Sequence, residues 1–299
     1  MAGRYPKPSV EDREAKVQGL IGRMSDGVAA ALANPEAWKT ALRRQARFHR
    51  YSFGNQILIA VQAPGATQVA GYRTWQAAGR QVRKGEKGLA ILAPMIVSKR
   101  ETDTEGREVE RHVLVGFRAE HVFDIAQTDA MAGHEQAQAP EPFALAADLA
   151  FADLRRFAEG EGLTVEVRYS GEPDVHGYYQ PATRAIVVDP RFPGLMRCKT
   201  LAHEIAHSIL HPQGYDAGEN PKPRGLAELE AESTAFVVLS ALGLETADLE
   251  WYSFGYVAGW HPEPKAVLAA GERIAKAARA MIAAVLGARG EGAADEAIA

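Results

Sequence analysis

The stretch from Thr200 to His211 constrains the fold of this chain more than any other part of the sequence. Its apolar residues recur at the spacing of an amphipathic helix, and Pro212 ends the pattern. Within this stretch His203 and His207 are four residues apart. Both imidazoles therefore lie on one face of the helix, where they can point at a single ion.

A metal site explains the pattern better than an ordinary surface helix does. The residues form a His-Glu-x-x-His motif, in which Glu204 is placed to take a proton from metal-bound water. Imidazole nitrogens are preferred ligands of zinc, and we therefore predict a Zn²⁺ site. The alternative is two solvent-facing histidines on a common helix. The apolar flanks of the motif and a glutamate-rich helix downstream favour the metal site.

The helix expected over 226–243 offers a third ligand, which a catalytic zinc site needs beside its open position. We assign this ligand to Glu228 and expect Glu232, on the same helix face, to accept a hydrogen bond from a histidine N–H. The two roles are interchangeable at this stage, whereas Glu230 points to the other side of the helix. His211 is a rival ligand, but its position at the helix end better suits a cap or a wall of the cleft.

Composition places the chain among ordinary globular proteins. It has 299 residues, enough for two domains, with 46% hydrophobic and 24% charged residues. No apolar run approaches the roughly 18 residues of a membrane span, and the first residues lack the apolar core of a secretory signal. The single cysteine, Cys198, lies on the apolar side of the motif helix and is expected in the core. We therefore expect a cytoplasmic protein without membrane association.

Charge is distributed unevenly along the chain. Residues 1–125 carry 20 Lys+Arg and 13 Asp+Glu, whereas residues 126–299 carry 14 and 25. Within residues 38–90 there are ten basic residues and one acidic residue, Glu86. So one-sided a block is typical of contact with a polyanion, most commonly nucleic acid. The alternative is a basic face that only keeps the protein in solution.

The periodicity predicts an α+β chain of two domains, each mixing helices and strands. In the N-terminal domain, residues 1–125, we expect a helical arm over 9–33, a helix over 35–50, a short helix capped by Asn55, and strands at 89–97 and 109–117. We interpret 126–142 as a linker and 288–299 as a disordered tail. In the second domain, 143–287, we expect helices at 143–161 and 264–286, a strand at 163–169 and a hairpin over 176–189, besides the two helices of the metal site.

Several motifs together resemble the ArdC-type antirestriction proteins over roughly 35–125 and 143–285. In the first half the resemblance is carried by Tyr51-Ser52, Asn55–Leu58, Trp75–Ala77 and, most specifically, Gly79–Gly88. In the second half it is carried by the His203–His207 motif, by Glu228–Glu232 and by Tyr256–Trp260. The second half is also similar to the ImmA/IrrE peptidases. The chain departs from many ArdC-type members after His207, where His211-Pro212 replaces an Arg-Leu pair.

The resemblance implies a single-stranded-DNA-binding domain followed by a gluzincin-like metallopeptidase domain with a small sheet. Single-stranded DNA is held by cations on phosphates and by aromatic rings stacked on bases. The candidate DNA contacts in the basic block are Arg43, Arg44, Arg47, Arg50, Tyr51, Phe53, Asn55, Tyr72, Arg73, Trp75, Arg83, Lys84 and Lys87. For each aromatic ring, packing in the core is an equally good explanation.

The sequence thus predicts a DNA-binding zinc peptidase, in which Glu204 acts as base and later as proton donor. The strand at His176–Gln180 would lie along the cleft and receive an extended peptide, whose identity the sequence does not indicate. The resemblance further implies protection of incoming plasmid or phage DNA. Two alternatives stay open: a DNA-binding protein whose peptidase fold no longer cuts, and an ImmA/IrrE-like protease that cleaves a repressor.

Overall fold

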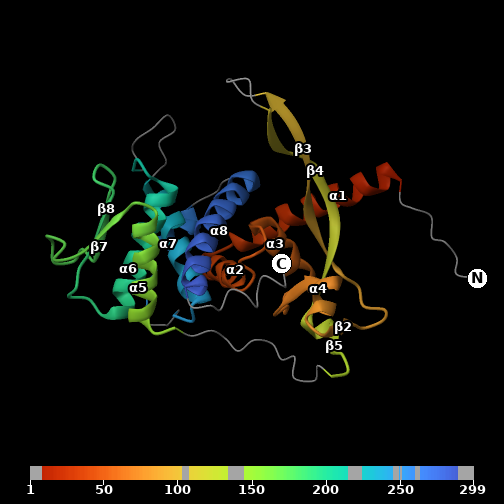
Figure 1. Cartoon of the computed structure of the whole chain (residues 1–299), viewed down its shortest axis with the longest axis horizontal. Coiled ribbons are helices and arrows are strands. Elements are labelled where there is room, and N and C mark those ends of the chain that lie inside the picture. Colours follow the sequence, from red (N-terminus) through yellow and green to blue (C-terminus); the bar gives the residue numbers. More distant parts are fainter. Residues whose placement is uncertain are drawn as a thin grey trace, which may run out of the picture.

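The computed structural model describes residues 9–102, 108–133, 145–214, 224–244, 249, 251–259 and 263–288. It has the predicted α+β character, with helices and small antiparallel or mixed sheets (Figure 1). We call 9–133 the N-terminal part and 145–288 the C-terminal part. The expected tail beyond 288 and positions 134–142 of the expected linker lie outside the described residues. Trp260, the last residue of one resemblance motif, also lies outside them.

Three helices open the N-terminal part, and local capping sets where each begins. They are α1 (Val10–Ala31), α2 (Pro35–Arg47) and α3 (Phe53–Gln62). Ser9 and Asp12 form a capping box at α1, and Asn34 caps α2, which has a proline at its start. The cap of α3 is Ser52, whose side chain accepts from the backbone N–H of Asn55. The predicted cap at Asn55 is therefore wrong.

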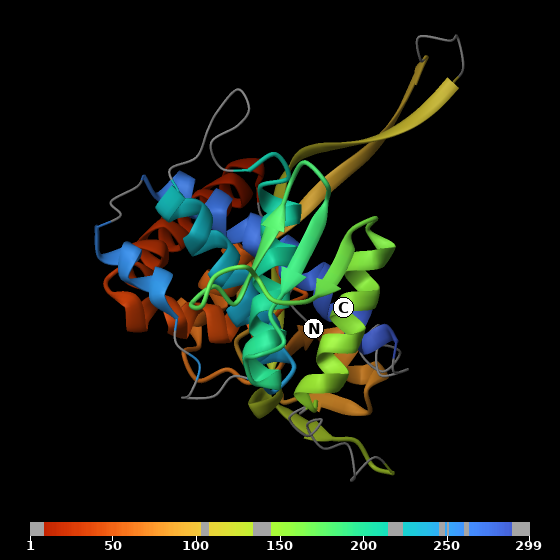
Figure 2. The same ribbon diagram turned by 90° about the vertical axis from the view of Figure 1, so that its left-hand side faces the viewer.

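The rest of the N-terminal part is built on a long two-stranded ribbon. Its strands β3 (Leu89–Thr102) and β4 (Glu108–Asp124) pair antiparallel and extend away from the helices (Figures 1 and 2). Strand β1 (Val69–Gly71) pairs with the end of β4, and helix α4 (Tyr72–Ala77) follows it. After η1 (Ile125–Gln127), strand β5 (Thr128–Ala130) pairs with β2 (Arg80–Val82). Residues 128–130, which we interpreted as linker, are thus part of a strand pair.

Two amide side chains of α3 hold the edge of the ribbon. Asn55 donates from Nδ2 to the carbonyl of Leu92 and accepts from its N–H, each at 2.9 Å. Gln62 bonds Ala90 in the same way, at 2.8 Å and 2.9 Å. Each amide satisfies both backbone groups of one edge residue, as a neighbouring strand would. The helix therefore closes this stretch of β3 to other strands.

The C-terminal part has four long helices and a small three-stranded sheet at one side of them (Figure 1). The helices are α5 (Ala147–Gly160), α6 (Gly194–Leu210), α7 (Arg224–Ala241) and α8 (Pro264–Gly287), with a 3₁₀ segment η2 (Tyr252–Gly259) before the last. The strands β6 (Thr164–Val167), β7 (Gly177–Gln180) and β8 (Ala185–Val188) lie in the order β6-β8-β7. The predicted β7–β8 hairpin is confirmed, and β7 lies at an edge of the sheet.

Both parts contribute to one hydrophobic core. Trp38, Leu42 and Phe53 belong to the same buried cluster as Phe236 and Ile274 of the C-terminal helices. The indole of Trp38 donates to the hydroxyl of Ser233 at 3.0 Å, in a fully buried contact. Helices α2 and α3 therefore pack directly on α7 and α8. Among the described helices, none has the length and apolar character that a bilayer crossing requires.

Candidate functional site

Three potential ligand atoms converge where α6 faces α7. The Nε2 atoms of His203 and His207 lie 3.0 Å apart. Oε2 of Glu228 lies 3.3 Å from the first and 3.4 Å from the second. A point equidistant from the three atoms would be about 1.9 Å from each, close to the 2.0–2.2 Å typical of zinc with nitrogen and oxygen ligands. The donor set and its spacing therefore fit a divalent metal ion.

The environment leaves these groups recessed but reachable. The side chains of His203, His207 and Glu228 are 17%, 10% and 28% exposed, so the site is recessed but open on one side. Hydrogen bonds from both histidines hold the pKa of Glu228 well below its usual range. Burial opposes protonation of His203, but its hydrogen bond to Glu228 and nearby carboxylates outweigh burial and raise its pKa. The histidines and the carboxylate thus lie where a cation would replace shared protons.

The other two glutamates of α7 have structural partners. Glu232 accepts from the ammonium of Lys199 at 3.3 Å and from the backbone N–H of Ser253. Its predicted role as an acceptor for the metal-site histidines stays a prediction. Glu230 is fully buried and forms an ion pair with Arg273 of α8. Among the described residues, only Glu228 of the three belongs to the group that could hold a metal.

His211 lies beside the site without joining it. It is the residue at which α6 ends, and its ring centroid is 5.6 Å from that of His207. Its Nε2 is 3.5 Å from a carboxylate oxygen of Glu230. His211 is therefore turned toward the buried carboxylate and lines the cleft, which is one of the two roles the sequence suggested.

The convergent atoms open into a cleft of about 670 Å³ between α6, α7 and the edge strand β7. Glu204, only 8% exposed, lines it beside the histidines. A side chain at Gly177 would come within 2.4 Å of the Val187 carbonyl, so glycine lets β7 lie close against its neighbours. The sequence alone did not single out Gly177 or Arg224, which also lines the cleft. A glycine at the start of a short strand was the signal available for the first.

The predicted DNA cations separate into three groups. Arg43 and Arg47 are exposed, with the guanidinium of Arg43 5.6 Å from the Phe236 ring and Arg47 donating to a backbone carbonyl. Arg44 and Arg50 are half-buried. Exposed Arg73, Lys84 and Lys87 surround the turn after β2, whereas Arg83 within that turn pairs with Glu86 and Asp129. The structure does not gather all the cations on one surface.

Three of the predicted stacking rings and the predicted amide contact are structural. Phe53 and Trp75 are 1% and 3% exposed, and the indole of Trp75 donates to the Phe123 carbonyl. Tyr51 donates to the Val69 carbonyl, and burial raises its pKa to about 12. These three rings are held in or against the core, and their contact with bases stays a prediction. The same holds for Asn55, whose amide is fully engaged with Leu92.

One aromatic pair combines an exposed ring with a half-buried one. The ring of Tyr72 is 43% exposed and meets Phe123 edge to face, with centroids 6.5 Å apart. Tyr72 was among the candidate rings, but Phe123 was missed. Its alternation with polar neighbours on β4 was the available signal.

Comparisons with known proteins agree with this geometry. Residues 17–123 match the N-terminal domain of anti-restriction factor ArdC, and residues 158–254 match the IrrE N-terminal-like domain. The fold is similar to that of the Mn(II)-bound antirestriction protein ArdC from plasmid R388. That crystal structure has a TM-score of 0.51 and 22% identity over 90% of this chain and 98% of the other. The metal-free structure of the same protein is 23% identical over 79% and 86% of the two chains, with a TM-score of 0.47.

A curated relative is the uncharacterized protein pXO2-81 of Bacillus anthracis, 23% identical over 86% of this chain. The chain spans about half the length of that relative, 48% of it. The N-terminal match covers the helices, the ribbon and the basic turn, and the second match covers the metal cleft. The chain therefore combines a region that matches the ArdC N-terminal domain with a following region that matches the IrrE N-terminal-like domain.

Proposed function

We propose that this protein is a metal-dependent peptidase that also binds single-stranded DNA and acts in antirestriction. The observation that carries the peptidase is the convergence of His203, His207 and Glu228 beside an edge strand and a recessed carboxylate. Metal ligands, a base and a surface for an extended peptide are the parts that metal-assisted peptide hydrolysis requires. Glu204 supports cleavage over a non-cutting fold, because a purely structural metal site needs no base.

His203, His207 and Glu228 would hold the ion, and two imidazoles with one carboxylate are a ligand set typical of catalytic zinc. The Mn(II) bound by the related crystal structure shows that the related protein holds a divalent metal. The ion, when bound, supplies Lewis acidity that polarises a peptide carbonyl and lowers the pKa of water.

The chain's own residues supply the rest. Glu204 accepts a proton from the attacking water and passes it to the nitrogen of the leaving amine. The outer edge of β7 has no strand beside it within the described sheet, so its backbone can pair with an extended peptide along the cleft. Tyr178 and Tyr179 of this strand line the same cleft and would contact the side chains of that peptide.

Basic composition supports the DNA-binding activity. Residues 1–125 carry seven more basic than acidic residues, and several of the cations are exposed. Contacts to phosphates depend on charge and not on base sequence, so we expect binding with little sequence preference. A DNA-binding peptidase of this family would protect incoming plasmid or phage DNA from restriction.

Metal content tests the site most directly. Protein purified without chelator should hold about one zinc per chain, and Glu228→Ala should lose it. The Glu232→Gln variant is the matched control, since Glu232 lies one turn away on the same helix and should leave the metal in place. Metal retained by Glu228→Ala would contradict the proposed ligand set.

Activity is tested separately on a mixture of unfolded proteins. Cleavage by the wild type should disappear in Glu204→Gln while the metal remains bound. A wild type that holds metal but cuts no protein in the presence or absence of DNA would favour the non-cutting alternative.

A further inference from the structure

We propose that a hollow formed by Tyr72, Gln81, Lys84 and Phe123 receives an unpaired base of single-stranded DNA. This inference rests on the proposed DNA binding and assigns it a site. The hollow measures about 590 Å³ and lies between α4, the turn after β2 and the end of β4. Its lining combines two aromatic rings, an amide, and both cations and carboxylates, namely Tyr72, Gln81, Val82, Arg83, Lys84, Glu86, Phe123 and Asp129.

The aromatic wall is exposed and held in position. Tyr72 stands edge to face with Phe123 at an interplanar angle of 72°. Its hydroxyl accepts a hydrogen bond from Nε2 of Gln81 at 2.7 Å, and the same amide donates to the Val82 carbonyl. A base that stacks on this ring therefore gains contact without first ordering the side chain. Every base presents an aromatic face, so stacking tolerates any sequence.

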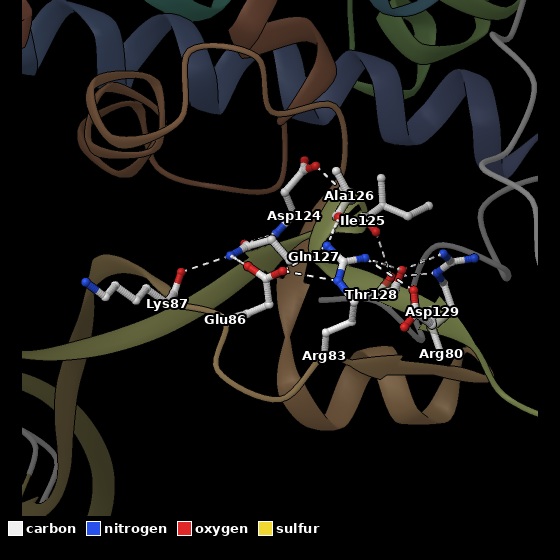
Figure 3. A network of polar contacts seen from close by, with 10 residues as sticks. All are labelled: Arg80, Arg83, Glu86, Lys87, Asp124, Ile125, Ala126, Gln127, Thr128 and Asp129. Atoms are coloured by element: carbon white, nitrogen blue, oxygen red, sulfur yellow. Dashed lines mark hydrogen bonds and ion pairs between the residues drawn. The ribbon is translucent and has the colours of Figure 1, made fainter.

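In the turn beside the Tyr72 ring, Arg83 forms the stabilising hydrogen bonds, whereas Lys84 and Lys87 are exposed to solvent. Arg83 donates to Glu86, Asp129 and the Ala126 carbonyl, and Gln127 ties Glu86 to the backbone of Lys87 (Figure 3). These contacts fix the turn from Arg83 to Lys87. The Lys87 ammonium points away from the network (Figure 3).

Lys84 is exposed and lines the hollow, and Arg73 and Lys87 are exposed cations that follow the lining residues Tyr72 and Glu86 in sequence. Within the described part of the chain, none of the three forms an ion pair, in contrast to Arg83. Cations without acidic partners are available to phosphates, whereas Arg83 would have to give up Glu86 and Asp129 first. The hollow thus offers a stacking ring with phosphate-binding groups at its rim, which is the pattern of a single-strand site.

The carboxylates in the lining favour an unpaired base over a duplex. Hydrogen bonds from Gln127 and Arg83 lower the pKa of Glu86, so it is ionised and acts only as an acceptor. Each of the four bases carries an N–H group on its Watson–Crick edge, and that edge is free only in a single strand. Glu86 and Asp129 would accept from it, while Tyr72 covers the face of the base.

Fluorescence anisotropy of a dye-labelled single strand tests the site in the full-length chain. Tyr72→Ala should weaken binding by about 5- to 150-fold, the range expected for one stacked base. Tyr72→Phe keeps the stacking face and loses only the hydrogen bond that orders it, so it should lose much less affinity than Tyr72→Ala. Lys84→Gln should reduce affinity and lower the slope of log affinity against log salt by about 0.7, as expected for one phosphate contact.

Phe117→Ala is the matched control, because Phe117 is an equally exposed ring, 44%, on the same strand as Phe123 but outside the hollow. Its affinity should match the wild type. An oligonucleotide with abasic positions should lose affinity for the wild type and lose little for Tyr72→Ala. Circular dichroism and metal content of each variant show that the fold is kept.

The outcomes separate this inference from the function on which it rests. If the wild type does not bind single strands, the proposed DNA binding itself fails. If the wild type binds and Tyr72→Ala binds equally well, the hollow is not the site. Loss of binding in an Arg43→Gln/Arg47→Gln variant alone would place the site on α2 and overturn only this inference.

Discussion

Asn55 pairs with Leu92 through both ends of its amide, as a neighbouring strand would, although it lies in a helix. The sequence pattern predicted that Asn55 caps a helix or contacts DNA. Either role would occupy the amide that bonds Leu92 in the structure. Asn55→Ala would leave the N–H and C=O of Leu92 without partners at a part-buried edge. We expect a loss of about 1–3 kcal/mol in the free energy of unfolding.

Urea unfolding followed by circular dichroism checks this value, with the exposed Gln76→Ala as the control that should change little. DNA affinity of Asn55→Ala, measured where the variant is folded, should equal that of the wild type. A specific loss of affinity without loss of stability would return Asn55 to the DNA contacts.

Glu228 and Glu232 lie one helical turn apart and should respond differently to the same substitution. Glu228→Gln should weaken metal binding, because an amide is a poorer zinc ligand than a carboxylate. Glu232→Gln should keep the metal but destabilise the fold by about 3–5 kcal/mol, since it leaves the buried Lys199 ammonium without its partner. Metal titration and thermal unfolding of the two variants separate these effects. The opposite pattern would exchange their roles.

Asp189 should make the unfolding free energy depend on pH in the acid range. Its side chain is fully buried, and hydrogen bonds from Arg191 and the Ser170 N–H hold its pKa below the usual value. A lowered folded-state pKa stabilises the protein above the unfolded value of about 3.9, and this stabilisation is lost as pH falls below it. Urea midpoints measured from pH 6 to pH 3 should therefore fall. Asp189→Asn should start lower and fall less steeply.

Separating the chain between its two parts should unfold the first of them. Trp38, Leu42 and Phe53 pack into a core that they share with residues of the C-terminal part, among them those of α7 and α8. A fragment of residues 1–133 would expose these large side chains. We expect it to lack the near-ultraviolet signal of packed aromatics and to bind a hydrophobic dye. A fragment that unfolds cooperatively by itself would contradict this expectation. The full chain, unfolded under the same conditions, is the reference.

Local signals allowed much of the fold to be predicted. The starts of the helices at Val10 and Pro35, the hairpin, and the histidine spacing on α6 depend on residues close in sequence, and the structure has them close to where they were expected. The convergence of Glu228 with the two histidines was also expected from helix geometry. Its assignment as a ligand stays a prediction.

The burial of two candidate rings and the shared core depend on contacts between residues that are far apart in sequence. Phe53 and Trp75 are aromatic residues within a basic block, which is typical of rings that stack on bases, but α8 and β4 cover them. Burial of this kind arises from tertiary packing, which no local pattern contains. The shared core was missed for the same reason, because a charge difference between halves says nothing about whether their apolar faces meet.

The shared core also fixes the distance between the hollow and the cleft. Helix α4, which borders the hollow, and helix α6, which borders the cleft, lie well apart along the long axis (Figure 1). Packed helices hold them there: Glu272 of α8 accepts from the Gly54 N–H at 2.9 Å, and Arg273, the next residue, pairs with Glu230 behind the cleft. If DNA occupies the hollow and the cleft cuts proteins, as we propose, the packed helices would hold the cleft at a fixed distance from the bound strand. Proximity to DNA would then choose what is cut, and the peptide sequence need not.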